Sequence, residues 1–320
     1  MSSSAAAGFG LLSASSWGGS DFVGGLGARR APALLVVVSG HSFTLIVLLA
    51  ICLSMRLAVP GWGPFLYSAI GGLEGAFALA LFYRALAMGV MGLTAALCGL
   101  LTALVPVLFS MIHDGLPTPL VAAGLGMGLC AIWLITRTPN ASEGLTGEPV
   151  SQTPGTADQG IPLTASSVPP RTPASRAPLL MGALAGIGFG SQLILLKMAG
   201  AVSIFWIMTY ARAAGVLGLI AVLLVLSRMK PRKAMLDEAQ SGPRWAFLGL
   251  GLLAGSLDTL GNLFYILASR LGRLDVAALV SSLYPGGTIL LAMLVLGEKP
   301  SRQQVAGIAL ALTAVVLLSV

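Results

Sequence analysis

The chain contains the same apolar pattern twice. A shift of 183 residues brings identical residues together, placing Ala85 on Ala268, Gly89 on Gly272, Pro117 on Pro300 and Gly124 on Gly307. The segments around these positions are almost wholly apolar in both copies. Two copies of a hydrophobic multi-span unit are typical of transporters, which often place the substrate path between two repeats.

The composition indicates an integral membrane protein. Hydrophobic residues make up 56% of the chain and charged residues 9%, whereas a soluble domain carries about 25% charged residues. The net charge of +7 does not indicate a nucleic-acid partner, because most basic residues lie in short segments between apolar runs. Cys52, Cys98 and Cys130 have no paired spacing, so neither a disulfide nor a metal site is expected. No cofactor motif is found.

Ten apolar runs are long enough to cross a bilayer, which takes roughly 20 residues. They cover 7–27, 32–54, 64–88, 92–112, 119–136, 178–199, 202–227, 245–268, 276–296 and 303–320. The sequence therefore predicts an all-α integral membrane protein with ten transmembrane helices.

A Pro/Ser/Thr-rich segment divides the spans into two groups of five. It has few apolar residues and no periodicity, which is typical of a disordered linker. We expect a five-helix repeat over 1–136, a linker over 137–177 and a second five-helix repeat over 178–320. Because five is odd, the second repeat would be inverted in the membrane relative to the first.

The basic residues at span ends predict the orientation in the membrane. One face would carry twelve of them and the other only Arg56, Arg270 and Arg273. The more basic face is expected in the cytoplasm, which places both termini outside. Three pairs of glycines four residues apart predict close helix packing inside the bundle; they are Gly71/Gly75, Gly182/Gly186 and Gly251/Gly255.

Four strings resemble a known family when taken together. They are "SASSWGGSDFVGG", "ALFYRALAMG", "GSLDTLGNLFYILASRLG" and the final "LVSSLYPGGTILLAMLVLGEKPSRQQVAGIALALTAVVLLS". As a set they resemble the EamA family of the drug/metabolite transporter (DMT) superfamily. The resemblance implies ten helices in two inverted repeats and transport of small organic solutes across the bacterial inner membrane. Members of the family are often drawn with both termini in the cytoplasm, against the charge count.

Charged residues inside predicted spans are candidate site residues, because a charge in the bilayer is costly. Asp21 lies four residues after Trp17, so the two share a helix face. A carboxylate beside an aromatic wall would suit a cationic or amphipathic solute; a carboxylate satisfied by nearby Ser or backbone groups is the alternative. Asp258, Asn262 and Tyr265 also share one face, and would either bind substrate or join helices.

Glu74 and Arg212 are further candidates. Glu74 is flanked by glycines, which leaves space for proton exchange at its carboxylate; an ion pair with a base is the alternative. Arg212 would either receive a substrate carboxylate or balance a buried acid. Arg84 and Lys197, nearer span ends, are expected to extend toward the headgroups.

Two prolines are candidate helix breaks. Tyr284 and Pro285 interrupt the ninth span, and Gly286-Gly287 follows; Pro106 could break the fourth span in the same way or form a static kink. Matched breaks in corresponding spans would indicate the substrate site, with Tyr284 beside it. His41 and His113 are interpreted as ordinary polar residues.

These features predict a secondary transporter that moves a small metabolite or drug-like solute by alternating access, with proton coupling as an option. The cavity would be lined by spans one, three, four, six, eight and nine. The expected partners are the solute and the lipid bilayer, with the chain a monomer or homodimer. A membrane-embedded lipid-processing enzyme is the alternative, but the sequence offers no nucleophile–base motif. The chain is therefore expected not to be an enzyme.

Overall fold

The computed structural model describes all residues except 1, 89–90, 137–176, 230–245, 297–300 and 320. The predicted linker therefore falls outside the described residues, apart from Ala177. The described part is all-helical. Its helices are α1 (Ser2–Ala28), α2 (Ala33–Ser54), α3 (Trp62–Ala87), α4 (Met91–His113), α5 (Pro119–Thr136), α6 (Ala177–Met198), α7 (Ile204–Met229), α9 (Ala246–Leu271), α10 (Leu274–Ser281), α11 (Tyr284–Leu296) and α12 (Arg302–Ser319).

The helices coincide with the apolar runs of the sequence. The run predicted at 119–136 is α5 with the same bounds, and the Gly/Ser-rich first run begins earlier than expected, at Ser2. Among the described residues, five helices are long and apolar enough to cross a membrane, namely α2, α3, α6, α7 and α9. The molecule is a multi-pass membrane protein.

The ninth predicted span is two helices, whereas the fourth is one. The α10 helix ends at Ser281 and α11 begins at Tyr284, so the interruption precedes Pro285. Pro285 lies in the first turn of α11, where a backbone N–H has no acceptor within the helix. The missing N–H of proline therefore costs no helical hydrogen bond there. Of the two alternatives for Pro106, a break or a static kink, the break does not occur, because α4 is continuous through that residue. A proline can cost a helix one hydrogen bond without ending it, and no Gly-Gly pair follows Pro106 to loosen the next turn.

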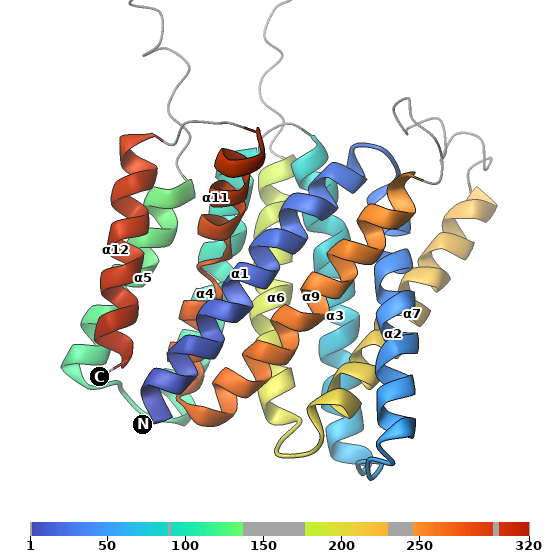
Figure 1. The fold of residues 1–320 in the computed structure, drawn as a ribbon, viewed down its shortest axis with the longest axis horizontal. Coiled ribbons are helices and arrows are strands. Elements are labelled where there is room, and N and C mark those ends of the chain that lie inside the picture. The colour runs from blue at the N-terminus through green and yellow to red at the C-terminus, as the bar shows by residue number, and fades with distance from the viewer. Residues whose placement is uncertain (1, 89–90, 137–176, 230–245, 297–300, 320) are drawn as a thin grey trace, which may run out of the picture.

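The helix contacts run across the two halves of the chain. The α1 helix packs against α9 and α11, and α6 packs against α3 and α4. The α5–α12 pair forms one edge of the bundle and the α2–α7 region forms the other (Figure 1). Long apolar side chains on these edges are exposed, including Ile46, Leu217 and Leu312. Such surfaces are stable in lipid and would be a liability in water.

The predicted glycine pairs lie at helix crossings within the chain. A Cβ atom on Gly182 or Gly186 would touch α4, and one on Gly251 would touch Ser39 of α2. The backbones of Gly40 and Gly255 meet so closely that neither position has room for a side chain. Close approach of this kind maximises dispersion contacts between helices in a membrane.

Both chain termini lie on the same side of the bundle (Figure 1). Arg29 and Arg228 are at the opposite side, where α1 and α7 end, and Arg302 begins α12 there. Arg56 and Arg273 lie on the side of the termini, beyond the ends of α2 and α9. Arg30 follows Arg29 directly in the chain. The remaining basic residues counted for the first face are outside the described residues; they are Arg137, Arg171, Arg176, Lys230, Arg232, Lys233, Arg244 and Lys299.

Candidate functional site

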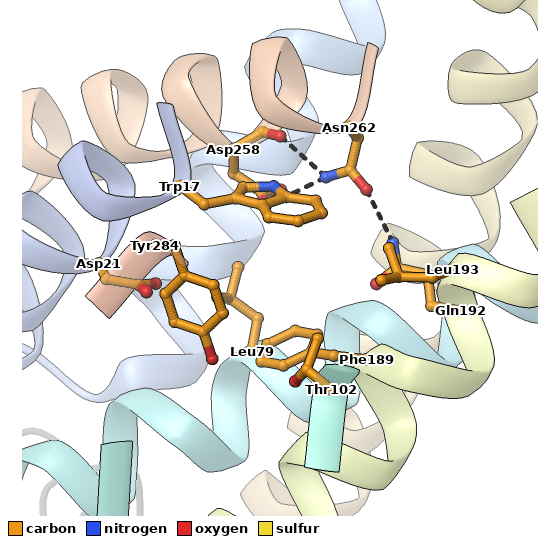
Figure 2. A pocket seen from close by; sticks show the side chains of 10 residues that line it. All are labelled: Trp17, Asp21, Leu79, Thr102, Phe189, Gln192, Leu193, Asp258, Asn262 and Tyr284. Carbon is orange, nitrogen blue, oxygen red and sulfur yellow. Dashed lines mark hydrogen bonds between the residues drawn. The ribbon is translucent and has the colours of Figure 1, made fainter. Parts of the chain in front are cut away.

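A cavity lies where helices of both halves meet (Figure 2). It is bordered by α1, α3, α4, α6, α9 and α11, the six elements that correspond to the predicted lining spans. Its lining residues are Trp17, Asp21, Leu79, Thr102, Phe189, Gln192, Leu193, Asp258, Asn262 and Tyr284. Polar side chains therefore gather in the centre of an apolar bundle, where they are expensive unless they have a function or a partner.

The cavity is small in this conformation. About 30 Å³ is open to the centre of a water molecule, and one water needs roughly 10–15 Å³ on this measure. An organic solute would not fit without movement of the surrounding helices. The structure is therefore a contracted state of the cavity.

Trp17 and Asp21 contribute the α1 wall. The Trp17 ring stacks on Tyr265 with centroids 6.2 Å apart and meets Tyr284 edge to face at 6.3 Å. Asp21 is one turn further along and is only 8% exposed. No hydrogen bond or ion pair joins its carboxylate to another described residue, so the satisfied carboxylate considered from the sequence is not what the structure contains.

Asp258, Asn262 and Tyr265 form the polar stripe predicted on α9. Asp258 and Asn262 line the cavity, and the Asn262 amide donates to the Asp258 carboxylate at 3.2 Å. Tyr265 is fully buried behind Trp17 and donates its hydroxyl proton to the Leu193 carbonyl at 2.7 Å. Two residues of the stripe thus face the cavity, and Tyr265 joins α9 to α6, which is one of the two alternatives for the stripe.

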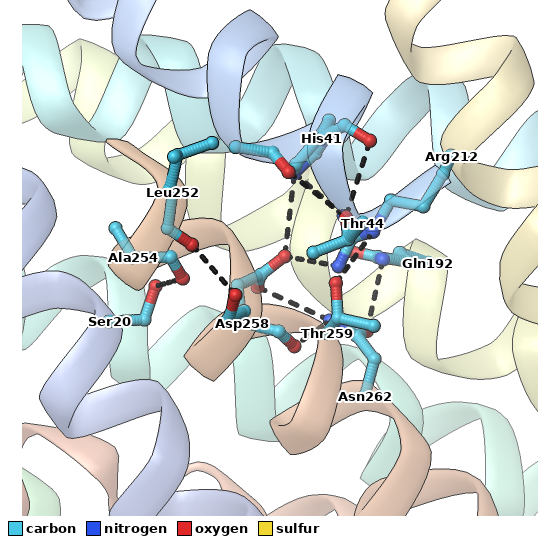
Figure 3. Close-up of polar contacts among 12 residues, drawn as sticks. Ser20, His41, Thr44, Gln192, Arg212, Leu252, Ala254, Asp258, Thr259 and Asn262 are labelled. Atoms are coloured by element: carbon cyan, nitrogen blue, oxygen red, sulfur yellow. Dashed lines mark hydrogen bonds and ion pairs between the residues drawn. The ribbon is translucent and has the colours of Figure 1, made fainter. Parts of the chain in front are cut away.

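Arg212 lies behind Asp258 and holds it from α7 (Figure 3). Its Nη2 donates to Asp258 Oδ2 at 2.5 Å and its Nε donates to the Thr259 hydroxyl at 3.1 Å. The side chain is 4% exposed and does not line the cavity. Arg212 therefore balances a buried acid, one of the two alternatives for this residue.

His41 belongs to the same network, which the sequence interpretation missed. Its Nε2 lies 2.6 Å from Arg212 Nη1 and 3.4 Å from Asp258 Oδ2. A guanidinium only donates hydrogen bonds, so Nε2 accepts and the imidazole is neutral with its proton on Nδ1. The network joins α2, α7 and α9 through one charge pair and one neutral ring.

Gln192 is a second residue that the sequence interpretation missed. It lies on α6 and its Nε2 donates to Asn262 Oδ1 at 3.2 Å. Its Oε1 occupies the space that a side chain at Gly75 would need. The amide of Gln192 thus extends the α9 polar stripe to α6, where it packs against Gly75 of α3 in the first half of the chain.

Tyr284 is in the cavity wall and Glu74 is not. The Tyr284 hydroxyl donates to Cys98 Sγ at 3.5 Å and so joins α11 to α4. Glu74 is half-buried on α3, and its Oε2 is buried without a hydrogen-bond partner among the described residues. The cavity residue on α3 is Leu79, five residues further on and about 140° around the helix from Glu74.

The missed residues had signals in the sequence. His41 and Gln192 are polar side chains inside predicted spans, which is the property that singled out the charged candidates. Thr102 and Phe189 had no such signal, because hydroxyl and aromatic side chains are ordinary in membrane helices. For each of these residues, the sequence does not identify the distant residue that its side chain contacts.

The described residues contain no group of three or more His, Cys, Asp or Glu that could hold a metal ion. The cavity offers two carboxylates, two amides, two hydroxyls and aromatic rings. These groups can bind a small solute through charge, hydrogen bonds and ring contacts.

Comparison with known proteins finds a family model that matches part of the chain. Residues 176–320 match the model of the EamA-like transporter family. No curated protein matches the sequence. A solved structure described only as the crystal structure of a protein is similar over 98% of this chain and 95% of its own, with a TM-score of 0.65 and 17% identity. At that identity the similarity concerns the fold.

Proposed function

Because residues 176–320 belong to the EamA-like transporter family, we propose that the chain is a secondary transporter in the bacterial inner membrane. It moves a small organic solute through the central cavity by alternating access. The observation that carries the proposal is the cavity itself, a polar site in the middle of an apolar bundle lined by helices from both halves. Transporters with internal repeats place their substrate sites in this position.

The helix contacts support ten spans in two inverted repeats. In this assignment α1 corresponds to α6, α2 to α7, α3 to α9, α4 to α10–α11, and α5 to α12. When each helix is replaced by its counterpart in the other half, the α1–α9 contact becomes α6–α3 and the α2–α9 contact becomes α7–α3. All four of these contacts occur in the structure. The α1 helix starts on the side of the termini, whereas α6 ends there (Figure 1), as inversion requires.

Small residues at the crossings between halves support relative movement of the repeats. Gly40 of α2 meets Gly255 of α9, and Gly72 of α3 meets Ala211 of α7. The two crossings are equivalent under the exchange of halves. Smooth backbone contacts of this kind allow packed helices to slide by small amounts, and such sliding would enlarge the contracted cavity.

The energy source is a gradient or solute exchange, since the sequence contains no G-x-x-x-x-G-K-[ST] nucleotide-binding string. Asp21 and Glu74 are the acids to test for proton coupling. Neither has a cationic partner among the described residues, whereas Asp258 is already paired with Arg212. A group that exchanges protons must be able to lose its charge without leaving a buried cation unpaired.

Solute counterflow in proteoliposomes tests the function. Purified protein should exchange a labelled solute for an unlabelled one in a saturable manner, at a rate far above that of empty liposomes. Solutes that raise the unfolding temperature of the detergent-purified protein are the ones to use, because a ligand of the native state stabilises it. Binding without counterflow of any bound solute would contradict transport.

The same liposomes test proton coupling. Uptake should increase with an imposed pH gradient, and the increase should be lost in Asp21→Asn or Glu74→Gln. Uptake that ignores both the gradient and these substitutions would leave transport standing and remove proton coupling.

A further inference from the structure

The charges that border the cavity do not cancel. Two carboxylates line it, those of Asp21 and Asp258. Asp258 has a cation at 2.5 Å, the Arg212 guanidinium. Asp21 has no such partner within the described residues and is 8% exposed. When both acids are ionised, one negative charge in the cavity is uncompensated.

Four hydrogen-bond donors in the cavity wall serve acceptors other than Asp21. The Asn262 amide donates to Asp258 and the Gln192 amide to Asn262. The hydroxyl of Thr102 donates to the Cys98 carbonyl, and that of Tyr284 to the Cys98 sulfur. A buried carboxylate without donors or a countercharge is expensive, and a bound cation would remove that cost.

Aromatic rings stand beside this carboxylate (Figure 2). Trp17 is one helical turn before Asp21. The Tyr284 ring meets the Trp17 ring edge to face, with an interplanar angle of 89°. Tyr265 stacks behind Trp17 and fixes its ring. The negative face of an aromatic ring attracts a cation within about 6 Å, most strongly for Trp.

We propose that the solute of this site is an organic monocation, with its positive group at Asp21 and its apolar part against Trp17 and Tyr284. The proposal rests on the transport function and names the substrate class of the same cavity. Anions are disfavoured by the two carboxylates, and neutral solutes leave the charge of Asp21 uncompensated.

Three probes of similar size and different charge test this. They are benzyltrimethylammonium, N,N-dimethylbenzamide and benzenesulfonate, titrated calorimetrically against the full chain in lipid nanodiscs. The permanent charge of the first ensures that its protonation does not change with pH. The cation should bind at least about tenfold more tightly than either other probe. Equal or weaker binding of the cation, or none, would overturn the proposal.

Matched substitutions assign the preference to Asp21. Asp21→Asn should reduce cation binding to the level of the neutral amide. Asp114→Asn makes the same chemical change at an exposed acid outside the cavity and should leave the preference intact. Asp21→Glu keeps the negative charge and should keep the preference for the cation. This variant tests the role of the charge if Asp21→Asn does not fold. A preference that survives Asp21→Asn, or is lost equally in Asp114→Asn, would assign the charge recognition elsewhere and overturn the proposal.

Counterflow of the same probes separates this proposal from the transport function. Counterflow of the amide or the sulfonate but not of the cation would keep the transporter and overturn the cation preference. Cation binding that depends on Asp21, without counterflow of any probe, would support the site and contradict transport.

Discussion

Arg212 on α7 and Asp258 on α9 form a buried ion pair, with Nη2 and Oδ2 2.5 Å apart. The pair neutralises Asp258 at the edge of the cavity and leaves Asp21 without an equivalent partner among the described residues. His41 and Thr259 occupy further donors of the same guanidinium. The arginine thus fixes three side chains on two helices at once.

Removal of the Arg212 side-chain charge should strongly destabilise the protein. Arg212→Met leaves the Asp258 carboxylate buried without its cation, which costs about 3–5 kcal/mol. The measurement is the free energy of unfolding by denaturant in detergent. The double variant Arg212→Met with Asp258→Leu is the control, and it should recover much of the loss. Equal losses in the single and double variants would contradict the pairing as the cause.

Gly255→Ala should destabilise the α2–α9 crossing. A Cβ atom there meets the backbone of Gly40, which cannot move without shifting the helix, so a cost of about 1–3 kcal/mol is expected. Gly249→Ala on the same helix is the control, because a Cβ atom at that position touches nothing within 4 Å. It should be neutral or slightly stabilising. The measurement is the thermal unfolding midpoint of the two variants under the same conditions. Equal midpoints would contradict the close contact between Gly40 and Gly255.

Gly261→Ala should weaken solute binding more than folding. The new Cβ would lie 2.5 Å from Trp17 Cδ1, so the ring must turn or shift away from its place against Tyr265. A side chain yields more readily than a backbone, and we expect a stability loss below that of Gly255→Ala. Titration of a bound solute should show an affinity reduced about tenfold or more. Unchanged affinity would show that the Trp17 ring position does not matter for binding.

Arg273 ties the two halves together on the side of the termini. It forms a salt bridge with Asp275 at 3.0 Å and donates to the Gly115 carbonyl at 3.2 Å, and the Asp275 carboxylate raises the pKa of Arg273. Arg273→Gln should release the α4–α5 connection. Backbone hydrogen exchange around Gly115 should become faster, while exchange at the far ends of α1 and α7 stays the same. Uniform acceleration throughout the chain would indicate general destabilisation instead.

The sequence was sufficient for the helices and for part of the site. Uninterrupted apolar runs set the helix bounds, and i, i+4 spacing placed Trp17 with Asp21 and Asp258 with Asn262. Spacing on one helix does not reveal the rotation of that helix about its axis. Glu74 therefore looked as well placed as Asp21, although α3 directs Leu79 to the cavity instead.

Contacts between distant helices could not be predicted from the sequence. His41 and Arg212 are 171 residues apart, and no local pattern joins them. Gln192 and Gly75 likewise fit one another only because α3 and α6 pack together. The interruption before Tyr284 was indicated by Pro-Gly-Gly, but a single proline at Pro106 was not enough to break α4.

Accessibility of the cavity from the two sides of the membrane tests alternating access most directly. Thr102→Cys places a thiol in the cavity wall, in a chain whose Cys52, Cys98 and Cys130 are replaced by alanine. Leu312→Cys, on an exposed apolar position of α12, is the lipid-facing control. A membrane-impermeant thiol reagent is added outside right-side-out and inside-out vesicles. We expect the cavity thiol to react in both preparations, a bound solute to slow the reaction, and the control thiol to react in neither. Reaction from one side only, or from neither, would contradict a site that opens alternately to the two faces.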